Sequence, residues 1–240
     1  MKKLVAILGY HKIGIPPGDW YTWNYVSENN FEAHLDLISR NNWEVLSAEK
    51  FIKSLSDPEI LPERSVLITF DDGYKNNLSV ALPCLRKFRF SAVLFIPVKF
   101  VGTYNAFDAD INYEPREDIC SWEELKQLEE GGISVHSHSV SHRHFSALNR
   151  EEKKAEIVKS KKLIEQKLKK RVSLFAFPYG DNGNDQIETG RILLDSGYKG
   201  AFLYQGGAMD VFHSDKFQIP RIPVGADTDL QKELKDALFF

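Results

Sequence analysis

The chain has 240 residues, of which 42% are apolar and 27% are charged, and its formal net charge is -3. A chain of this length and composition can bury a large core, and we expect one α/β domain over residues 1–240. The slight acidic excess argues against a nucleic acid or an anionic membrane as a partner. Cys84 and Cys120 form no C-x-x-C pattern, so the sequence predicts neither a disulfide framework nor a sulfur-ligated zinc site.

The first eleven residues resemble the start of a leader peptide, because two lysines precede an apolar run. That run is short and no small-residue cleavage site follows it, so we predict a strand over residues 4–10 instead. No apolar stretch approaches the roughly 20 residues that span a bilayer. The sequence as read therefore predicts a cytoplasmic protein without a membrane span. An extracellular or cell-envelope location would follow if a leader had been removed.

Apolar and β-branched runs alternate with segments of helical periodicity along the whole chain. We predict strands at residues 4–10, 43–46, 66–70, 92–97, 133–137, 173–177, 198–204 and 218–224. We predict helices at residues 27–41, 78–88, 121–131, 149–171 and 185–196, a short helix after Ser47 and a last one from Asp227. A long loop over residues 98–120 follows the fourth strand.

Strands that alternate with helices, without a repeat or a Pro/Gly-rich linker, predict parallel strands joined by right-handed crossovers. A barrel of seven or eight strands is the simplest way to close such a sheet. In these barrels the functional groups lie on the loops that follow the carboxyl ends of the strands. We therefore expect one mouth to collect the polar residues found at such places, which are His11, Asp71, Asp72, His138, His142, Tyr179 and Arg221.

Asp71 and Asp72 end the apolar strand over residues 66–70, and Gly73 permits a sharp turn after them. Two neighbouring carboxylates in one cleft repel each other unless a cation or strong donors compensate them. This pair therefore predicts a metal ion. The alternative is a solvated Asp-Asp-Gly turn.

A second polar cluster lies at residues 136–144, which contain four of the seven histidines. His138 and His142 would converge on one ion if the segment between them made a helical turn. Imidazole and carboxylate together are a common ligand set for divalent transition metals, so we expect Zn²⁺, with Co²⁺ or Ni²⁺ also suitable. The alternative is a polar loop that is rich in Ser and His.

Three motifs together resemble the polysaccharide deacetylase family, also called the NodB-homology or carbohydrate esterase 4 family. They are Thr-Phe-Asp-Asp-Gly at residues 69–73, His-Ser-x-x-His at 138–142 and Phe-Ala-Phe-Pro-Tyr-Gly at 175–180. The resemblance covers nearly the whole chain and implies an α/β fold of the NodB-homology type, a distorted (β/α)7–8 barrel in one domain. It also implies that Asp71 is the catalytic base and that Asp72, His138 and His142 hold a divalent metal.

The chain departs from the commonest family pattern in three places, one of which is His136, where a Gly is frequent. The third motif lacks the Arg that usually orients the base, and Arg221 is the candidate replacement. The C-terminal Leu-x-His motif that supplies the usual general acid is absent. Residues 9–13 instead resemble the N-terminal Tyr-His motif of the subgroup that deacetylates poly-N-acetylglucosamine, in which this His, here His11, is the acid. His213 is the alternative acid, and the role of His136 is open.

The chemistry of these groups indicates a mechanism. A divalent ion with three protein ligands keeps a position open for water and polarises a carbonyl group. Asp71 would accept the proton of the water, and His11, with an ordinary pKa of about 6.5, would protonate the leaving amine. The backbone N–H of Tyr179 is the candidate donor to the oxyanion.

An aromatic-rich loop follows His11, with Trp20, Tyr21, Trp23 and Tyr25 within six residues. Two interpretations are open for these side chains. Trp20 and Trp23 would stack on sugar faces at the rim of the site, as would Tyr179, or the aromatic side chains would pack the loop onto the barrel.

Three functions remain, and each takes a carbohydrate as its partner. The leading hypothesis is a metal-dependent hydrolase that acts on linear amide C–N bonds and removes acetyl groups from the N-acetylated amino sugars of a poly- or oligosaccharide. The alternatives are an O-acetyl esterase acting on xylan-like material and an inert carbohydrate-binding module.

Overall fold

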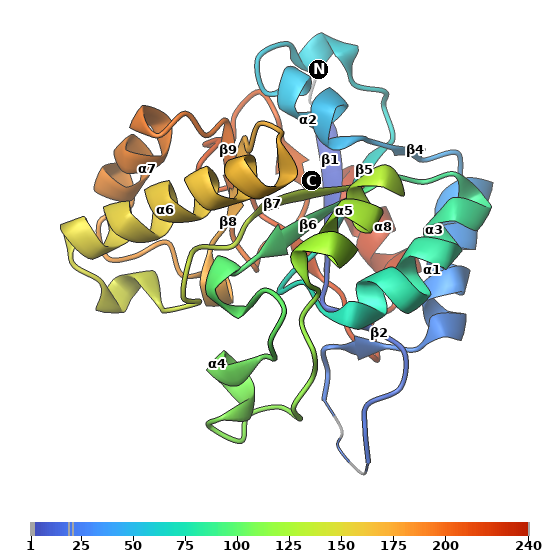
Figure 1. Cartoon of the computed structure of the whole chain (residues 1–240). Coiled ribbons are helices and arrows are strands. Elements are labelled where there is room, and N and C mark those ends of the chain that lie inside the picture. Colours follow the sequence, from blue (N-terminus) through green and yellow to red (C-terminus); the bar gives the residue numbers. More distant parts are fainter. Residues whose placement is uncertain (1–2, 19, 21, 240) are drawn as a thin grey trace.

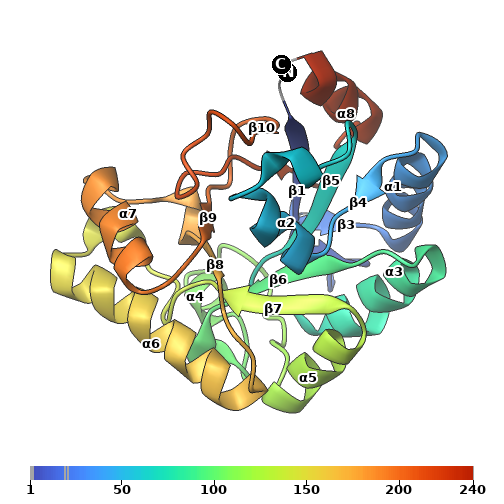
Figure 2. The ribbon, with the colours of Figure 1, turned by 90° about the horizontal axis from the view of Figure 1, so that it is seen from above.

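The computed structural model describes residues 3–18, 20 and 22–239. Residues 238 and 239 are described by their backbone alone. A curled sheet forms its centre, with helices on the outer side (Figure 1, Figure 2). The strand order is β10-β1-β5-β6-β7-β8-β9, and every pair along it is parallel except β1 with β10. The bounds of these strands are β1 Leu4–Tyr10, β5 Ser65–Phe70, β6 Ala92–Ile96, β7 Ile133–Ser137, β8 Leu174–Ala176, β9 Gly200–Phe202 and β10 Met209–Asp210. The predicted α/β class is confirmed.

The barrel is closed between β9 and β1 by a nearly irregular segment. The predicted strand over residues 218–224 is reduced to β11 (Ile222–Pro223), which pairs in parallel with β1. Ile219 forms only an isolated bridge with Phe202, and the N–H of Arg221 donates to the carbonyl of Gln205. The predicted distorted barrel is therefore confirmed, and its distortion lies at this seam. The predicted second strand is also short, since β4 (Glu44–Val45) only borders β5.

Eight α-helices are described, and most of them begin and end near the predicted positions. Their bounds are α1 Glu28–Arg40, α2 Ala48–Ser54, α3 Leu82–Phe88, α4 Ala106–Ala109, α5 Trp122–Glu130, α6 Arg150–Leu168, α7 Gln186–Asp195 and α8 Leu230–Phe239. A π-helical turn, Asn77–Ala81, replaces the first part of the helix predicted over residues 78–88. Helix α6 ends earlier than predicted because Lys169 adopts a left-handed φ of 54°.

Alternate residues of the parallel strands fill the barrel interior. Val5 and Ile7 of β1 pack there with Leu67 of β5 and Phe95 of β6. Phe51 of α2 joins the same cluster, so α2 covers the amino end of the barrel (Figure 2). The other strand faces pack against the outer helices. This arrangement leaves the carboxyl end of the barrel for polar side chains.

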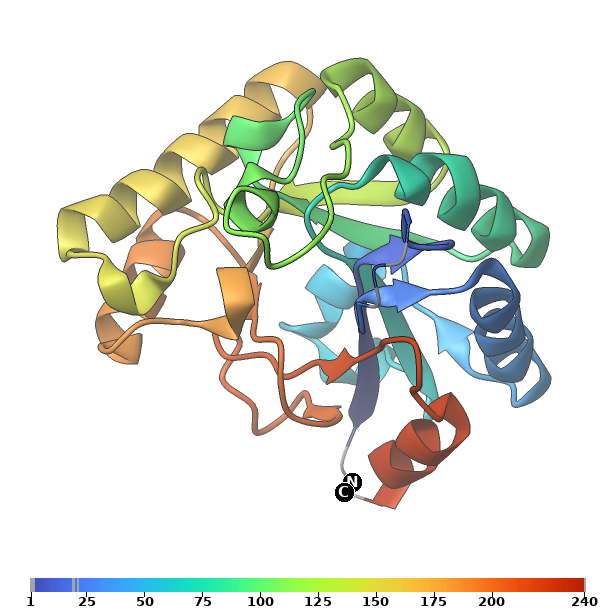
Figure 3. The same cartoon turned by 90° about the horizontal axis from the view of Figure 1, so that it is seen from below.

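Two connections border the carboxyl end of the barrel (Figure 3). One contains the small sheet of β2 (Lys12–Ile13) and β3 (Tyr25–Val26), which the sequence analysis missed. The other spans residues 98–120 and is more ordered than the predicted loop, because it contains α4 and an isolated bridge between Tyr104 and Asp118. Among the described residues no helix is long and apolar enough to cross a bilayer. That residues 1–240 form one domain stays a prediction.

Candidate active site

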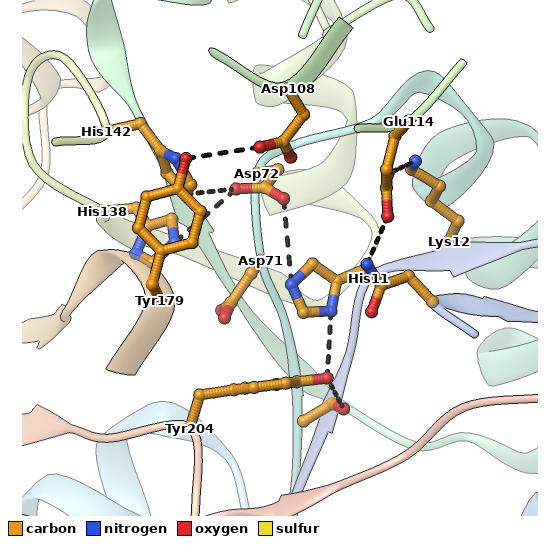
Figure 4. Close-up of polar contacts among 12 residues, drawn as sticks. His11, Lys12, Asp71, Asp72, Asp108, Glu114, His138, His142, Tyr179 and Tyr204 are labelled. Carbon is orange, nitrogen blue, oxygen red and sulfur yellow. Dashed lines mark hydrogen bonds and ion pairs between the residues drawn. The ribbon is translucent and has the colours of Figure 1, made fainter. Parts of the chain in front are cut away.

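Asp72, His138 and His142 form a buried group where β5 and β7 end (Figure 4). One ligand atom of each lies within 4.8 Å of the other two. His142 Nε2 is 3.2 Å from Asp72 Oδ1, and His138 Nε2 is 3.6 Å from the same oxygen. The structure thus brings together the three side chains that the sequence predicts as metal ligands.

The hydrogen-bonding state of this group fits a divalent cation. His138 Nδ1 lies 2.8 Å from the carbonyl oxygen of Ala176, so Nδ1 carries the hydrogen and the lone pair of Nε2 faces Asp72. Burial lowers the pKa of His138 and lowers that of His142 to about 3, which leaves both rings neutral at pH 7. Asp72 Oδ1 is buried without a hydrogen-bond donor in the part of the chain that the structure describes. A divalent cation would supply the partner that Asp72 Oδ1 lacks, so these residues fit such an ion.

His138 and His142 converge without the helical turn that the sequence analysis gave as the condition. This segment is a loop in which Ser139 and His142 adopt positive φ angles of 71° and 56°. Glu156 of α6 holds the loop, because its carboxylate accepts the two central backbone N–H groups at 2.7 and 2.8 Å. Glu156 lies in a lysine-rich helix, and nothing in its local sequence indicates this contact.

Asp71 forms a bidentate ion pair with Arg221, with N–O distances of 2.8 and 2.7 Å. Arg221 is fully buried and also donates to the carbonyl of Leu203. Burial alone would raise the pKa of Asp71, but the charge of Arg221 and its hydrogen bonds hold this pKa well below its usual range. Asp71 is therefore ionised and oriented at neutral pH, as a proton acceptor must be. The prediction that Arg221 lies within the last strand is wrong, because Arg221 directly precedes β11.

His11 follows β1 and lies between Asp72 and Tyr204 (Figure 4). Its Nε2 is 3.8 Å from Asp72 Oδ2, and its Nδ1 is 3.1 Å from the Tyr204 hydroxyl. That hydroxyl can donate to the carbonyl of Gly9, 3.2 Å away, while it accepts from Nδ1–H, which directs Nε2 to the cleft. Burial lowers the pKa of His11, although the charges of Asp72 and Asp71 oppose this effect. The ordinary pKa assumed from the sequence is therefore wrong.

These side chains line one cleft of about 210 Å³ at the mouth of the barrel. Its lining consists of His11, Asn24, Asp71, Asp72, Asp108, Tyr113, His138, His142, Tyr179 and Tyr204. Typical pockets for drug-sized ligands measure roughly 300–1,000 Å³. The cleft therefore suits one acylated group of a sugar better than a run of several sugars.

A sequence model described as polysaccharide deacetylase matches residues 59–199, which is more than half of the chain. The chain belongs to the polysaccharide deacetylase family. The matched range contains Asp71, Asp72, His138, His142 and Tyr179, whereas His11 and Arg221 lie outside it.

Individual relatives of the chain are distant in sequence. YxkH of Bacillus subtilis (strain 168) is 26% identical over 183 residues, which are 76% of this chain and 60% of YxkH. The poly-beta-1,6-N-acetyl-D-glucosamine N-deacetylase of Staphylococcus aureus (strain MSSA476) is 27% identical over 217 residues, which are 85% of this chain and 69% of that enzyme. The chain thus spans only part of the length of these relatives.

Solved structures agree with the fold over almost the whole chain. The Streptococcus pyogenes deacetylase PplD in complex with acetate has a TM-score of 0.82 at 19% identity, covering 98% of this chain and 99% of PplD. IcaB from Ammonifex degensii has a TM-score of 0.80 at 21% identity, covering 98% of this chain and 97% of IcaB. These likenesses confirm the predicted NodB-homology fold.

Among the described residues, the aromatic side chains of the loop after His11 do not line this cleft. Trp23 packs elsewhere, because its Nε1 donates to Asp227 Oδ1 at 2.5 Å and its ring lies directly against Gly225. Trp20 is 44% exposed and lines a separate hollow of about 790 Å³. Tyr21 lies outside the described residues. Trp23 thus takes the packing role, and sugar stacking by Trp20 stays a prediction.

Tyr179 lies at the rim of the cleft with a left-handed φ of 57°. Its ring contacts that of His142, with centroids 4.6 Å apart, and stacks on that of His144 at 4.1 Å. Its hydroxyl donates to Asp108 Oδ1 at 3.3 Å. The predicted contacts of Tyr179 with an oxyanion and with sugar stay predictions.

The sequence analysis missed several groups in and around the cleft, among them Tyr204, Asp108 and the ion pair of Lys12 with Glu114. Lys12 is fully buried, and Glu114 also accepts a hydrogen bond from Asn24 Nδ2. The paired residues are 102 positions apart, so no local pattern indicates this contact. Burial raises the pKa of Asp108 to about 7, and the charges of Asp72 and Glu114 add to the effect.

The two remaining histidines of the sequence analysis lie away from the cleft. His213 is hydrogen-bonded to Asp210, which pairs with Leu4 at the opposite end of β1 from His11, so the structure does not support His213 as the acid. His136 points into the barrel interior against Phe95, and burial lowers its pKa well below the usual range. We interpret His136 as a neutral core residue.

Proposed function

We propose that this polysaccharide deacetylase is a metal-dependent hydrolase that removes acetyl groups from the N-acetylated amino sugars of a poly- or oligosaccharide. The observation that carries the proposal is that Asp71, fixed by Arg221, and His11, held by Tyr204, adjoin the same three-ligand group in one cleft. Hydrolysis of an amide needs both a base for the water and an acid for the amine. The name of the Staphylococcus aureus relative supports the same substrate class.

Asp72, His138 and His142 would hold the ion, and Zn²⁺ suits two imidazoles and a carboxylate. When bound, such an ion acidifies a water molecule and polarises the acetyl carbonyl. Asp71 accepts a proton from the attacking water, and the backbone N–H of Tyr179 stabilises the oxyanion. His11 first takes up a proton from solvent at Nε2, because its neutral form carries the hydrogen on Nδ1. The imidazolium then donates this Nε2 proton to the nitrogen, the C–N bond breaks, and acetate and the sugar amine leave. Asp71 finally returns the proton of the water to solvent.

Acetate release tests this proposal. The substrates are β-1,6-linked and β-1,4-linked N-acetylglucosamine oligosaccharides and acetylated xylan, each with metal-free protein and with protein loaded with Zn²⁺, Co²⁺ or Ni²⁺. We expect acetate from an N-acetylated substrate only after metal loading, and loss of activity with a chelator. Release from acetylated xylan alone would favour the esterase, and binding without any turnover by the metal-loaded forms would favour a binding module.

A further inference from the structure

Asp108 of α4 lines the cleft, but the proposed mechanism gives it no role. Its side chain is only 6% exposed, and it belongs to the cleft that contains Asp72 and His11. Figure 4 shows Asp108 on the far side of the cleft from Tyr204, with its carboxylate facing Tyr179. A substrate that enters between His11 and Tyr179 therefore meets Asp108.

The other buried carboxylates around the cleft each have a basic or metal-binding partner. Asp71 pairs with Arg221, Glu114 pairs with Lys12, and Asp72 belongs to the group that fits a cation. Asp108 differs, because within residues 3–18, 20 and 22–239 its carboxylate accepts only the hydroxyl of Tyr179. Above its raised pKa of about 7 the Asp108 carboxylate is ionised and can accept about four hydrogen bonds. Its remaining accepting positions have no donor among the described residues and are available to a ligand in the cleft.

The loop that presents Asp108 is held in place at several points. The Asn105 side chain donates to the carbonyl of Pro115 at 3.0 Å and accepts the N–H of Glu117 at 2.8 Å. Glu114 ties the same loop to Lys12, the residue that follows His11. A carboxylate kept buried by such a fixed loop is costly unless it binds something, because buried polar groups are normally hydrogen-bonded.

We propose that Asp108 binds substrate: its carboxylate accepts a hydrogen bond from a hydroxyl group of the sugar that carries the acetamide, and it selects sugars in which that hydroxyl is unsubstituted. This inference rests on the proposed function, since it places an N-acetylated sugar in the cleft. A sugar hydroxyl fits because it is the donor that every such ring presents close to its acetamide group. Discrimination of this kind is strong, since a site built to bind a hydroxyl is left with an unpaired polar group by an analogue that lacks it.

The test compares Asp108→Ala with wild type on an N-acetylglucosamine oligosaccharide and on 4-nitrophenyl acetate, which has no sugar. We expect kcat/KM on the oligosaccharide to fall about 10–100-fold, the usual effect of losing a hydrogen bond to a charged group. The loss on the aryl acetate should be at least about tenfold smaller. Equal losses on both substrates would place Asp108 in the chemistry and overturn the inference.

Three further variants separate the alternatives. Asp110→Ala removes an exposed carboxylate of the same loop that accepts from Tyr104, and it controls for a general change of loop charge. Tyr179→Phe removes the only hydroxyl that donates to Asp108 in the described chain, so an equal oligosaccharide loss in this variant would mean that Asp108 only positions Tyr179. Asp108→Asn should lose less than Asp108→Ala, because its amide oxygen still accepts from a hydroxyl. A loss as large as that of Asp108→Ala would mean that the negative charge of Asp108 is what the ligand needs, and it would overturn the assignment to a hydroxyl.

A binding measurement keeps this inference separate from the proposed function. Calorimetry with the same oligosaccharide compares Asp71→Asn with Asp71→Asn/Asp108→Ala, neither of which needs turnover. We expect the dissociation constant to rise about tenfold or more in the double variant, and an unchanged constant would refute the contact. Absence of acetate release by metal-loaded wild type would instead count against the proposed function alone.

Discussion

Arg221 and Asp71 form a bidentate ion pair at the base of the cleft, although 150 positions separate them in the sequence. Both side chains are almost completely buried. The planar guanidinium fixes both carboxylate oxygens at once, which a lysine ammonium does not do. This pair therefore sets both the direction and the protonation state of the proposed base.

The first prediction is that Arg221→Lys moves the acid limb of the pH–rate profile to higher pH. In wild type Arg221 holds the pKa of Asp71 below its usual range, so Asp71 stays ionised down to low pH. With a weaker partner the pKa of Asp71 rises, and activity is lost at a higher pH as the base becomes protonated. Profiles of kcat/KM between about pH 4 and pH 9 measure the shift.

Asp71→Asn is the matched control for this prediction, because it removes the titrating group and keeps the shape. It should retain bound metal and lose nearly all turnover at every pH, since an amide cannot take the proton of the water. An unchanged acid limb in Arg221→Lys would mean that Asp71 does not control the profile.

The second prediction concerns the group of Asp72, His138 and His142. Replacing any one of them by Ala should weaken metal binding by roughly 100-fold or more. Substitution of a residue that only hydrogen-bonds to a metal ligand already lowers metal affinity about 10–100-fold, and loss of a ligand should cost more. His144→Ala is the control, since its ring lies in the same segment but outside the group. Mass spectrometry of the dialysed proteins measures the metal, and wild-type content in all three variants would refute the assignment.

The parallel strands could be predicted from the sequence because their apolar runs are buried on both faces. The predicted bounds of β1 and β7 agree with the structure, and β5 differs by one residue. The closing segment could not be predicted as well, because Pro220 and Pro223 lack the N–H groups that a regular ladder uses. The periodicity of a chain indicates which faces are buried, but it carries little information about where an irregular seam closes a barrel.

The residues of the candidate site also differ in how well the sequence predicts them. Asp71 and Asp72 are adjacent, and His138 and His142 are close in sequence, so a local pattern identifies them. The position of Asp108 and the ion pair of Lys12 with Glu114 depend on contacts between segments that are distant in sequence. Such contacts produce no local sequence pattern from which they could be predicted. Burial also changes acid–base properties, which is why the ordinary pKa assumed for His11 was wrong.

The third prediction is that Glu114→Gln destabilises the fold by about 3–5 kcal/mol, because it leaves the charge of Lys12 buried without a partner. The double variant Lys12→Met/Glu114→Leu should be closer to wild type, since it removes both charges together. Urea unfolding of the metal-free proteins measures the differences. Glu123→Gln, which breaks an exposed pair with Lys126, should cost at most about 1 kcal/mol. A similarly small loss of unfolding free energy in Glu114→Gln would show that other groups compensate the buried charge of Lys12, and it would contradict the prediction.

The fourth prediction concerns His136 and the stability at acidic pH. Burial holds the pKa of His136 well below 6.5 in the folded chain, so below pH 6.5 only the unfolded chain takes up this proton. Stability is therefore lost as the pH falls below 6.5. His136→Leu should make the slope of the unfolding free energy between pH 6 and pH 5 shallower by up to about 1.4 kcal/mol per pH unit.

Urea unfolding at several pH values measures this slope, and His213→Leu, at an exposed ring, controls for the loss of a histidine in general. The slope is the informative quantity, because the loss of packing or of the contact with Ser173 changes stability equally at every pH. A wild-type slope in His136→Leu would mean that His136 is protonated in the folded chain.

The last prediction concerns His11 as the general acid. An amine leaves an amide readily only when it is protonated, whereas the alkoxide of an ester departs with little help. His11→Ala should therefore lower kcat about 10²–10⁴-fold on an N-acetylated oligosaccharide and clearly less on 4-nitrophenyl acetate. Bound metal should remain, because the metal-binding group consists of other side chains. Tyr204→Phe should give a smaller loss of the same kind, since it removes the hydroxyl next to Nδ1 and leaves the imidazole in place. Equal losses on the amide and the ester in His11→Ala would make His11 a structural or binding residue, and the acid would have to be sought among the other groups of the cleft.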